Sequence, residues 1–271
     1  MITISDLNFN YLGSSRKVYS NLSLTIKENC ICGLLGKNGV GKSTLLYLIS
    51  GLLTPTKGSI TVNGSTPHCR KQEFLQDIFV VMEEFHLPAI SLDDYININS
   101  PYYPNFSREV LEQCLADFEL PAELDNLKQL SMGQRKKVYM SFALATNTRI
   151  LLMDEPTNGL DIPSKAQFRR VMSRNMSEER TIIISTHQVH DVDQLLDHVI
   201  ILSNDDVLMN KSTEEITNEY VFEYRNPADM DDIIYAEPTL QGNAVMAPRA
   251  GRAETPINIE LLFNALHCKK I

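Results

Sequence analysis

A nine-residue segment near the N-terminus has the residue types and the spacing of a phosphate-binding loop. It follows a short apolar run, 31–35, and precedes a helical pattern of apolar residues, 45–53. Glycines in such a loop let consecutive backbone N–H groups surround phosphate oxygens, and the helix N-terminus adds positive potential. A lysine contacts the outer phosphates and a hydroxyl coordinates Mg²⁺. We therefore predict that ATP phosphates are bound by Gly36, Lys37, Asn38, Gly39, Val40, Gly41, Lys42, Ser43 and Thr44, with Ser43 as a metal ligand.

Two acidic residues, Asp154 and Glu155, follow the apolar run 150–153. Ligands of parallel sheets bind at the carboxyl ends of the strands, so both carboxylates are expected to face the nucleotide. We predict that Asp154 holds Mg²⁺ through a water molecule and that Glu155 accepts a proton from the attacking water. Acidic pairs also occur at ordinary strand ends, so this pattern indicates a site only together with the loop.

The elements that must position these residues alternate between strands and helices. Period-two patterning predicts half-buried strands at 2–9 and 22–26. The alternation of strands and helices along the chain predicts an α/β core with a largely parallel sheet. Residues 84–148 are helical in character, with Ser91 and Ser107 as N-caps, and interrupt the core as a subdomain. Shorter apolar segments predict the remaining core strands at 31–35, 59–62, 78–82, 150–153, 181–184 and 199–202.

The chain divides into two predicted parts. Residues 1–210 are expected to form a nucleotide-binding domain, with its helical subdomain at about 84–148, and residues 211–271 a small α+β extension. The extension has short predicted strands at 221–224, 233–236 and 244–246, and ends in an amphipathic helix with Ile259, Leu262, Phe263 and Leu266 on one face.

Composition limits the function classes. The chain has 271 residues, enough for one core and a small appendage. A net charge of −9 argues against nucleic acid as the main partner. No apolar run approaches the roughly 20 residues needed to span a bilayer, and we expect no signal peptide. Five scattered cysteines fit a reducing compartment, and Cys30 and Cys32 are expected to pack in the core.

The segment Leu130-Ser131-Met132-Gly133-Gln134 resembles the signature sequence of the ATP-binding-cassette (ABC) superfamily. Met132 stands where the family usually has glycine, so it either narrows the backbone approach or weakens the contact. The order of the motifs is also similar to that family over about residues 1–210. The resemblance implies an ABC-type P-loop NTPase core with an antiparallel β subdomain. It assigns a D-loop to Gly159-Leu160-Asp161 and a switch histidine to Ser185-Thr186-His187.

The resemblance also implies roles for individual residues. Two cassettes would bind each ATP head to tail, with Ser131, Met132, Gly133 and Gln134 acting on the nucleotide of the other chain. His187 would contact the γ-phosphate and position the water, whereas His190 and His198 are expected to be structural. Tyr11 is placed to stack on adenine, with Tyr19 as a competitor. Glu83 stands where the family has a glutamine that reaches Mg²⁺, with Met82 or Glu84 as alternatives.

The function implied by the resemblance is that of an ATP-binding and ATP-hydrolysing subunit of an ABC transporter. Such a subunit would act on the cytoplasmic face of the cell membrane with a second cassette and a separate integral-membrane permease. The compact helical region and the extension resemble stand-alone bacterial export cassettes. An alternative is an ABC-type ATPase acting on ribosomes or nucleic acid, but those proteins usually have paired cassettes or long coiled coils. An inert nucleotide-binding regulator is disfavoured by Lys42, Asp154, Glu155 and His187.

Overall fold

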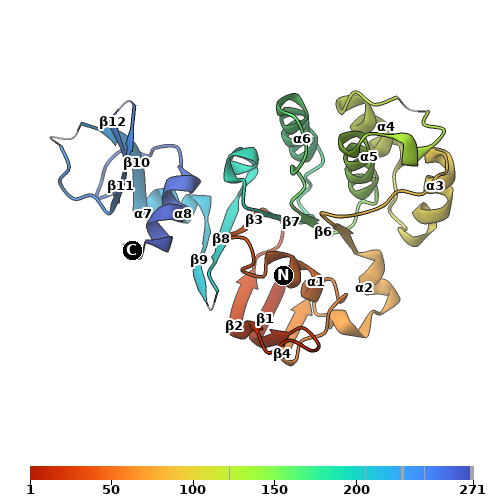
Figure 1. The fold of residues 1–271 in the computed structure, drawn as a ribbon, viewed down its shortest axis with the longest axis horizontal. Helices are drawn as coiled ribbons and strands as arrows, with labels where there is room; N and C mark the ends of the chain where they lie inside the picture. Colours follow the sequence, from red (N-terminus) through yellow and green to blue (C-terminus); the bar gives the residue numbers. More distant parts are fainter. Residues whose placement is uncertain (122, 205, 227–228, 241, 269–271) are drawn as a thin grey trace.

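The computed structural model describes residues 1–121, 123–204, 206–226, 229–240 and 242–268, which form three β-sheets (Figure 1). The central sheet has the strand order β5-β6-β7-β3-β8-β9, in which the first five strands are parallel and β9 is antiparallel to β8. Its strands are β3 (Ile31–Gly36), β5 (Ile78–Val81), β6 (Ile150–Asp154), β7 (Thr181–Thr186), β8 (His198–Leu202) and β9 (Val207–Ser212).

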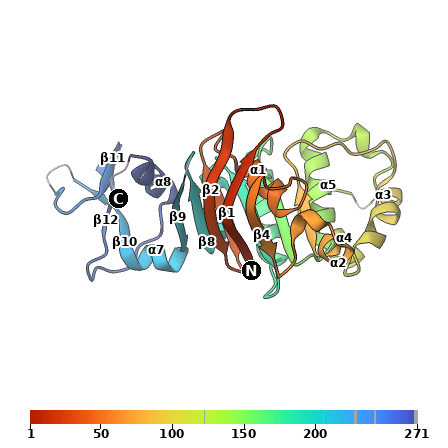
Figure 2. The same cartoon turned by 90° about the horizontal axis from the view of Figure 1, so that it is seen from below.

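One face of the central sheet is covered by helix α1 (Lys42–Ile49) and by an antiparallel sheet of order β2-β1-β4 (Figure 2). The strands of this smaller sheet are β1 (Ile2–Asn10), β2 (Lys17–Ile26) and β4 (Lys57–Val62). Alternate residues of the central strands point to opposite faces, so Leu34 and Ile183 join this core. A short helix, α2 (Gln72–Gln76), leads into β5.

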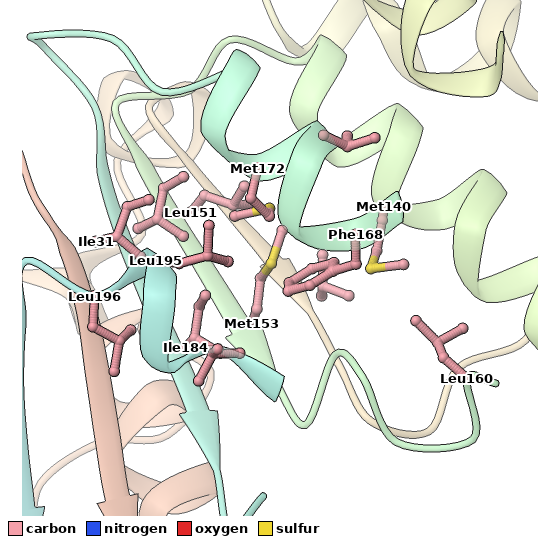
Figure 3. Close-up of a cluster of buried hydrophobic side chains, with 14 of the residues drawn as sticks. Ile31, Met140, Leu151, Met153, Leu160, Phe168, Met172, Ile184, Leu195 and Leu196 are labelled. Carbon is pink, nitrogen blue, oxygen red and sulfur yellow. The ribbon is translucent and has the colours of Figure 1, made fainter. Parts of the chain in front are cut away.

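The other face of the sheet packs against α5 (Met132–Ala145) and α6 (Ile162–Arg174). Figure 3 shows Leu151, Met153 and Ile184 of the sheet beneath Phe168 and Met172 of α6. All these side chains are almost completely buried, so α6 is fixed firmly on the sheet. Further residues of this cluster that are labelled in the figure are Ile31, Met140, Leu160, Leu195 and Leu196.

Residues 84–148 contain only helices and connecting segments in the part of the chain that the structure describes. The helices are α3 (Leu92–Asn99), α4 (Arg108–Asp117) and α5, with 3-10 turns at Ser100–Tyr102 and Leu127–Gln129. Ser91 caps α3 by accepting from the Asp94 N–H, and Ser107 caps α4 by accepting from the Val110 N–H. Both predicted N-caps are therefore present.

After β9 the chain forms a small unit at the opposite end of the molecule from the helical subdomain (Figures 1 and 2). Its sheet has the order β10-β12-β11. The apolar face of α8 belongs to the same buried cluster as α6, and His190 Nε2 lies 2.5 Å from Glu260 Oε2. The elements of this unit are α7 (Thr213–Glu219), β10 (Tyr220–Arg225), β11 (Tyr235–Thr239), β12 (Gly242–Pro248) and α8 (Ile259–His267).

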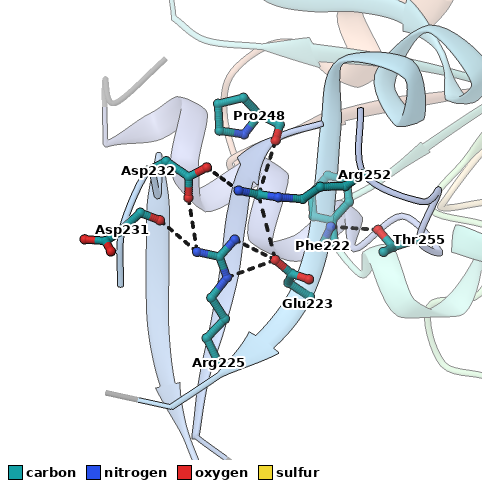
Figure 4. A network of polar contacts seen from close by, with 8 residues as sticks. All are labelled: Phe222, Glu223, Arg225, Asp231, Asp232, Pro248, Arg252 and Thr255. Carbon is teal, nitrogen blue, oxygen red and sulfur yellow. Dashed lines mark hydrogen bonds and ion pairs between the residues drawn. The ribbon is translucent and has the colours of Figure 1, made fainter. Parts of the chain in front are cut away.

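Two arginines tie the loops of this unit to its sheet (Figure 4). Arg225 forms ion pairs with Glu223 at 2.7 Å and Asp232 at 3.2 Å, and donates to the Asp231 carbonyl. Arg252 pairs with the same Asp232. Asp231 and Asp232 thus both contact arginines of the same unit.

Several predicted boundaries were wrong. Strand β2 begins at Lys17 and not at residue 22, because a long antiparallel pairing with β1 continues into its polar end. The helix expected at 45–53 is α1, which starts at Lys42 and ends at Ile49, since Gly51 turns the chain with φ +72°. The strand expected at 233–236 is β11, and β9 was not expected at all. None of the helices formed by the described residues is long and apolar enough to cross a bilayer.

Candidate active site

The predicted phosphate-binding loop connects β3 to α1 at the carboxyl edge of the central sheet. Gly39 and Gly41 have φ values of +79° and +108°, a region that glycine enters at little cost. A Cβ added to Gly36 would lie 2.7 Å from Val40 Cγ1, so this position also requires glycine. The loop geometry therefore explains the glycine spacing, and the backbone turns over the start of α1, where positive potential favours anions.

A cavity of about 860 Å³ lies over this loop. It brings together residues that are far apart in the sequence and that we predicted to serve one site. Gly36, Lys37 and Asp154 are not part of its lining. The predicted residues that line the cavity are Tyr11, Asn38, Gly39, Val40, Gly41, Lys42, Ser43, Thr44, Glu83, Glu155 and His187.

Glu155 is held on several sides. Its Oε1 lies 2.8 Å from His187 Nδ1 and 3.8 Å from Lys42 Nζ. Its Oε2 accepts a hydrogen bond of 3.0 Å from Thr186 Oγ1. The carboxylate is buried, so these contacts fix its direction toward the cavity, as a general base requires.

Lys42 is buried beneath the loop, where its ammonium donates to the Gly36 carbonyl at 2.9 Å. Burial lowers the pKa of Lys42, and the nearby carboxylates of Glu155, Asp154 and Glu83 oppose that change. The ammonium thus lies at the cavity floor among acceptors, where phosphate oxygens can replace part of its pairing.

Asp154 lies at the end of β6 and is only 1% exposed. Its Oδ1 accepts a hydrogen bond from Ser185 Oγ of the neighbouring strand β7, where the two residues are register partners. This bond orients the carboxylate. The Ser185 and Thr186 hydroxyls were not assigned roles from the sequence, although their place after an apolar strand beside Asp154-Glu155 was the available signal.

The donor set around the loop suits Mg²⁺. Ser43, Asp154 and Glu83 offer oxygen ligands, which this hard cation prefers. In the part of the chain that the structure describes, no group of three or more histidine, cysteine or acidic side chains is arranged to hold a metal alone. Mg²⁺ at nucleotide sites is commonly held by a few protein oxygens together with phosphate oxygens of the substrate.

The two candidate adenine-stacking tyrosines have different environments. Tyr11 is 44% exposed at the cavity, and its hydroxyl lies 2.9 Å from Thr44 Oγ1. Tyr19 is 3% exposed and donates to the Gly41 carbonyl at 2.8 Å. Tyr19 therefore supports the loop from the core, whereas the ring of Tyr11 is available to a base.

Of the three residues considered after β5, Glu83 lines the cavity and Met82 and Glu84 do not. Glu83 Oε1 accepts a hydrogen bond of 2.8 Å from Asn158 Nδ2. This contact joins the segment after β5 to the turn after β6. Asn158, which also lines the cavity, was not singled out from the sequence.

The signature residues Ser131, Met132, Gly133 and Gln134 lie outside the lining of this cavity. Ser131 caps α5 and forms a reciprocal pair of hydrogen bonds with Gln134. Met132 follows with 69% exposure. Asp161 also lies outside the cavity and caps α6 by accepting from the Ser164 N–H at 2.9 Å. None of these residues lines the cavity over the phosphate loop of its own chain, and all except the partly exposed Gly133 are exposed. Met132 lines a second cavity of about 440 Å³, which it shares with Glu83 and Asn158.

Comparison with known proteins decides the family. The family model described as "ABC transporter" matches residues 19–158, just over half of the chain. The chain belongs to the ABC transporter family. The predicted α/β fold with its antiparallel and helical subdomains is confirmed, and so is the predicted enzyme class, an ABC ATPase.

The relatives include proteins that work in opposite directions. The methionine import ATP-binding protein MetN of Carboxydothermus hydrogenoformans is 32% identical over 75% of this chain and 64% of its own length. The lipopolysaccharide export system ATP-binding protein LptB of Haemophilus influenzae is 28% identical over 81% of this chain and 93% of its own. A dimeric structure of the ATP-binding cassette MJ0796, bound to ADP and Pi, superposes with a TM-score of 0.68 at 24% identity, covering 78% of this chain and 98% of that cassette. This last likeness concerns the fold alone.

Proposed function

We propose that this chain hydrolyses ATP at the cavity over residues 36–44 and thereby powers export through a separate integral-membrane permease. The observation that carries the proposal is the convergence of Lys42, Glu155 and His187 beside the phosphate loop, where the lysine and the histidine both contact the buried carboxylate. These three side chains come from α1, the end of β6 and the segment after β7. A phosphate ligand, a proton acceptor and a group that orients it are the parts that phosphoryl transfer to water needs.

The mechanism follows from these positions. The loop N–H groups and Lys42 hold the phosphates, and Tyr11 stacks on the base. Ser43, Asp154 and Glu83 are the residues that would hold Mg²⁺, which when bound supplies positive charge to the phosphate oxygens. A water molecule attacks the γ-phosphorus while Glu155 takes its proton, and the bond to the ADP oxygen breaks. His187 keeps the carboxylate directed at that water and is placed to contact the γ-phosphate.

We propose a second cassette as the partner at this site. Ser131 to Gln134 begin a helix whose first turn is exposed and whose N-terminus favours anions. They do not line the nucleotide cavity of their own chain, so they would complete the site of another copy or of a paralogue. The solved structure of the MJ0796 cassette is a dimer, which supports this arrangement. Asp161 would lie beside the same contact.

Export is the direction we propose, on the cytoplasmic face of a bacterial-type membrane. The compact helical subdomain and the extension after β9 support it, and LptB, whose name specifies export, matches over most of its length. The name of MetN specifies import, so direction needs its own test. The alternative function, an ATPase acting on ribosomes or nucleic acid, is opposed by the net charge of −9.

The decisive experiment purifies the chain in mild detergent from its host and identifies what accompanies it. A protein with several membrane spans supports the proposal, whereas ribosomes or nucleic acid would overturn it. The complex is then placed in liposomes with ATP outside, where only outward-facing cassettes are active. Compounds from a host extract that accumulate in the lumen indicate export. ATP-dependent loss of preloaded extract from the lumen would instead indicate import.

A further inference from the structure

Lys136 is a buried lysine that belongs to none of the motifs. It lies in the second turn of α5, five residues after Ser131, and is only 4% exposed. Its ammonium donates to two backbone carbonyls, those of Glu155 and Asn158, each at 2.8 Å. These carbonyls belong to the turn that follows β6. A side chain of the helical subdomain is therefore bonded directly to the backbone of the proposed general base.

The environment of Lys136 is not that of a lysine used for packing. Lysine is rarely buried unless its charge is compensated. Burial lowers the pKa of Lys136, and the carboxylates of Glu83, Glu155 and Asp154 oppose that change. The hydrogen bonds of the ammonium are nevertheless with the two carbonyls of the turn, so Lys136 is tied directly to the backbone there.

The turn that Lys136 contacts has an unusual backbone. Glu155 has φ +45°, in the left-handed region that side chains with a Cβ seldom adopt. Such a conformation persists only where surrounding contacts enforce it, and it is common at functional sites. The Glu155 N–H donates to the Ser185 carbonyl at 2.9 Å. The Glu155 carbonyl accepts from Lys136 and, at 3.2 Å, from the Asn158 N–H, so both ends of this residue are held.

We propose that Lys136 is a positioning residue for ATP hydrolysis, which fixes the backbone of Glu155 and thereby directs its carboxylate at the attacking water. This inference rests on the proposed role of Glu155 as the general base. Rotation of the backbone at residue 155 would swing the carboxylate away from His187 and Thr186. A displacement of a reacting group by about 1 Å is enough to lower a rate about 100-fold.

The same contacts join the signature to the base within one chain. Ser131 and Met132 begin the helix that carries Lys136, and Asn158, the second acceptor, also donates to Glu83 at 2.8 Å. A shift of α5 relative to β6 changes both bonds of the ammonium at once.

The adjacent lysine provides a matched control. Lys137 is also partly buried on α5, and its ammonium donates to Gln167 Oε1 at 2.9 Å and to the Phe118 carbonyl at 3.3 Å. These bonds hold α5 to α6 and to the end of α4, away from Glu155. Replacing Lys137 by methionine therefore removes a comparable pair of hydrogen bonds without touching the turn.

The test compares the parent, Lys136→Met, Lys137→Met and Glu155→Gln in kcat, KM for ATP, equilibrium ATP affinity and thermal midpoint. Loss of two charge-assisted bonds should lower the kcat of Lys136→Met by roughly 10- to 100-fold. Its ATP affinity should stay within about threefold of the parent, because Lys136 does not line the nucleotide cavity. Lys137→Met should keep its kcat within about threefold even if its thermal midpoint falls equally.

A second variant keeps the inference testable if Lys136→Met does not fold. Lys136 lines an open cavity of about 440 Å³, so a small amine can enter the space left by Lys136→Ala. Ethylammonium should restore part of kcat, whereas tetramethylammonium, which has the same charge and no N–H donor, should not. Equal effects of the two cations, or no rescue by either, would reject the inference.

The outcomes separate this inference from the proposed function. If Glu155→Gln is inactive while Lys136→Met retains the parental kcat, Lys136 has no positioning role and the proposed function stands. Equal losses of kcat in the two lysine variants would also reject the role, because they indicate general loosening of α5. If Glu155→Gln is fully active, the proposed base is wrong whatever the lysine variants do.

Discussion

The carboxylate of Glu155 and the ammonium of Lys42 form a buried ion pair, with 3.8 Å between Oε1 and Nζ. Both side chains are less than one-tenth exposed. The lysine that we assign to the outer phosphates is thus paired with the proposed base. Phosphate oxygens would compete with Glu155 for this cation. With nucleotide bound, the orientation of the carboxylate should therefore depend more on His187, whose Nδ1 lies 2.8 Å from Oε1. Binding and base orientation are therefore coupled.

The first prediction concerns that lysine. Lys42→Ala removes the cation from the cavity floor and leaves Glu155 as an uncompensated negative charge near the phosphates. ATP affinity should fall about 10- to 100-fold, the value of one charge-assisted hydrogen bond. Fluorescence titration with a labelled ATP analogue measures it. Lys57→Ala, at an exposed position on β4, is the control and should bind like the parent. If Lys42→Ala binds ATP as tightly as the parent, the loop is not the phosphate-binding site.

The second prediction separates binding from hydrolysis. Glu155→Gln keeps the side-chain shape and loses the proton acceptor, so kcat should fall about 100- to 10,000-fold. ATP affinity should be equal to or higher than that of the parent, because no carboxylate then competes for Lys42. With ATP bound and not hydrolysed, a dimer should accumulate in size-exclusion chromatography with light scattering. Full ATPase activity in this variant would mean that another group takes the proton.

The parts of the site that could be predicted are those encoded by contiguous residues. The loop 36–44, the pair Asp154-Glu155 and His187 each follow an apolar strand, and their order along the chain supplies the context. The parallel sheet then places the strand ends at one edge, which is why distant motifs meet. The core strands could also be predicted from contiguous residues, since a short apolar run indicates a buried strand.

The parts that could not be predicted depend on contacts between distant segments. Lys136 reads as an ordinary helical residue, and only the packing of α5 against the turn after β6 reveals its acceptors. The burial of Tyr19 could not be predicted, because β2 begins at Lys17 and the polar residues at the start of this strand did not indicate it. Strand β9 contains polar residues that suit an edge, so its pairing with β8 was not apparent.

The third prediction concerns the departure at Met132. This residue is the first of α5 and is largely exposed, and its Sδ would lie 3.7 Å from a Cβ added at Gly159. If its side chain limits the approach of another cassette's phosphates, Met132→Gly should raise kcat at saturating ATP by a few-fold. Glycine at a helix end costs at most about 1 kcal/mol, so the thermal midpoint should fall only slightly. Met132→Leu retains the bulk and should match the parent. A lower kcat in Met132→Gly would show that the methionine contributes favourably to the contact.

The fourth prediction concerns the extension after β9. Leu262 of α8 is completely buried and belongs to the same apolar cluster as the sheet and α6. Leu262→Ala should therefore lower the free energy of unfolding by about 2–5 kcal/mol, as measured by urea denaturation. At urea concentrations too low to unfold the protein, ATP affinity should not change, since Leu262 does not line the nucleotide cavity. Leu240→Ala, at a fully exposed position in the same unit, should change stability by no more than about 0.5 kcal/mol. Equal stability of both variants would mean that α8 is not part of the folded core in solution.

The last prediction tests the metal. Glu83 is exposed at the nucleotide cavity, and its carboxylate is directed toward the turn after β6 by the bond from Asn158. A carboxylate at this place is a suitable oxygen ligand for Mg²⁺, but it repels phosphate when the ion is absent. Two unit charges 4 Å apart in water interact by about 1 kcal/mol, which corresponds to about a fivefold change in affinity.

We therefore expect Mg²⁺ to strengthen ATP binding about fivefold more in the parent than in Glu83→Gln, because glutamine keeps a carbonyl ligand and removes the repulsion. Glu83→Ala should lose both effects and bind Mg²⁺-ATP less well than either. The measurement is ATP affinity by calorimetry over a series of Mg²⁺ concentrations, with EDTA as the metal-free point. Glu84→Gln is the matched control, since Glu84 does not line the nucleotide cavity. If the curves of the parent, Glu83→Gln and Glu83→Ala superimpose, Glu83 does not reach the metal, and its bond to Asn158 serves only to hold the turn.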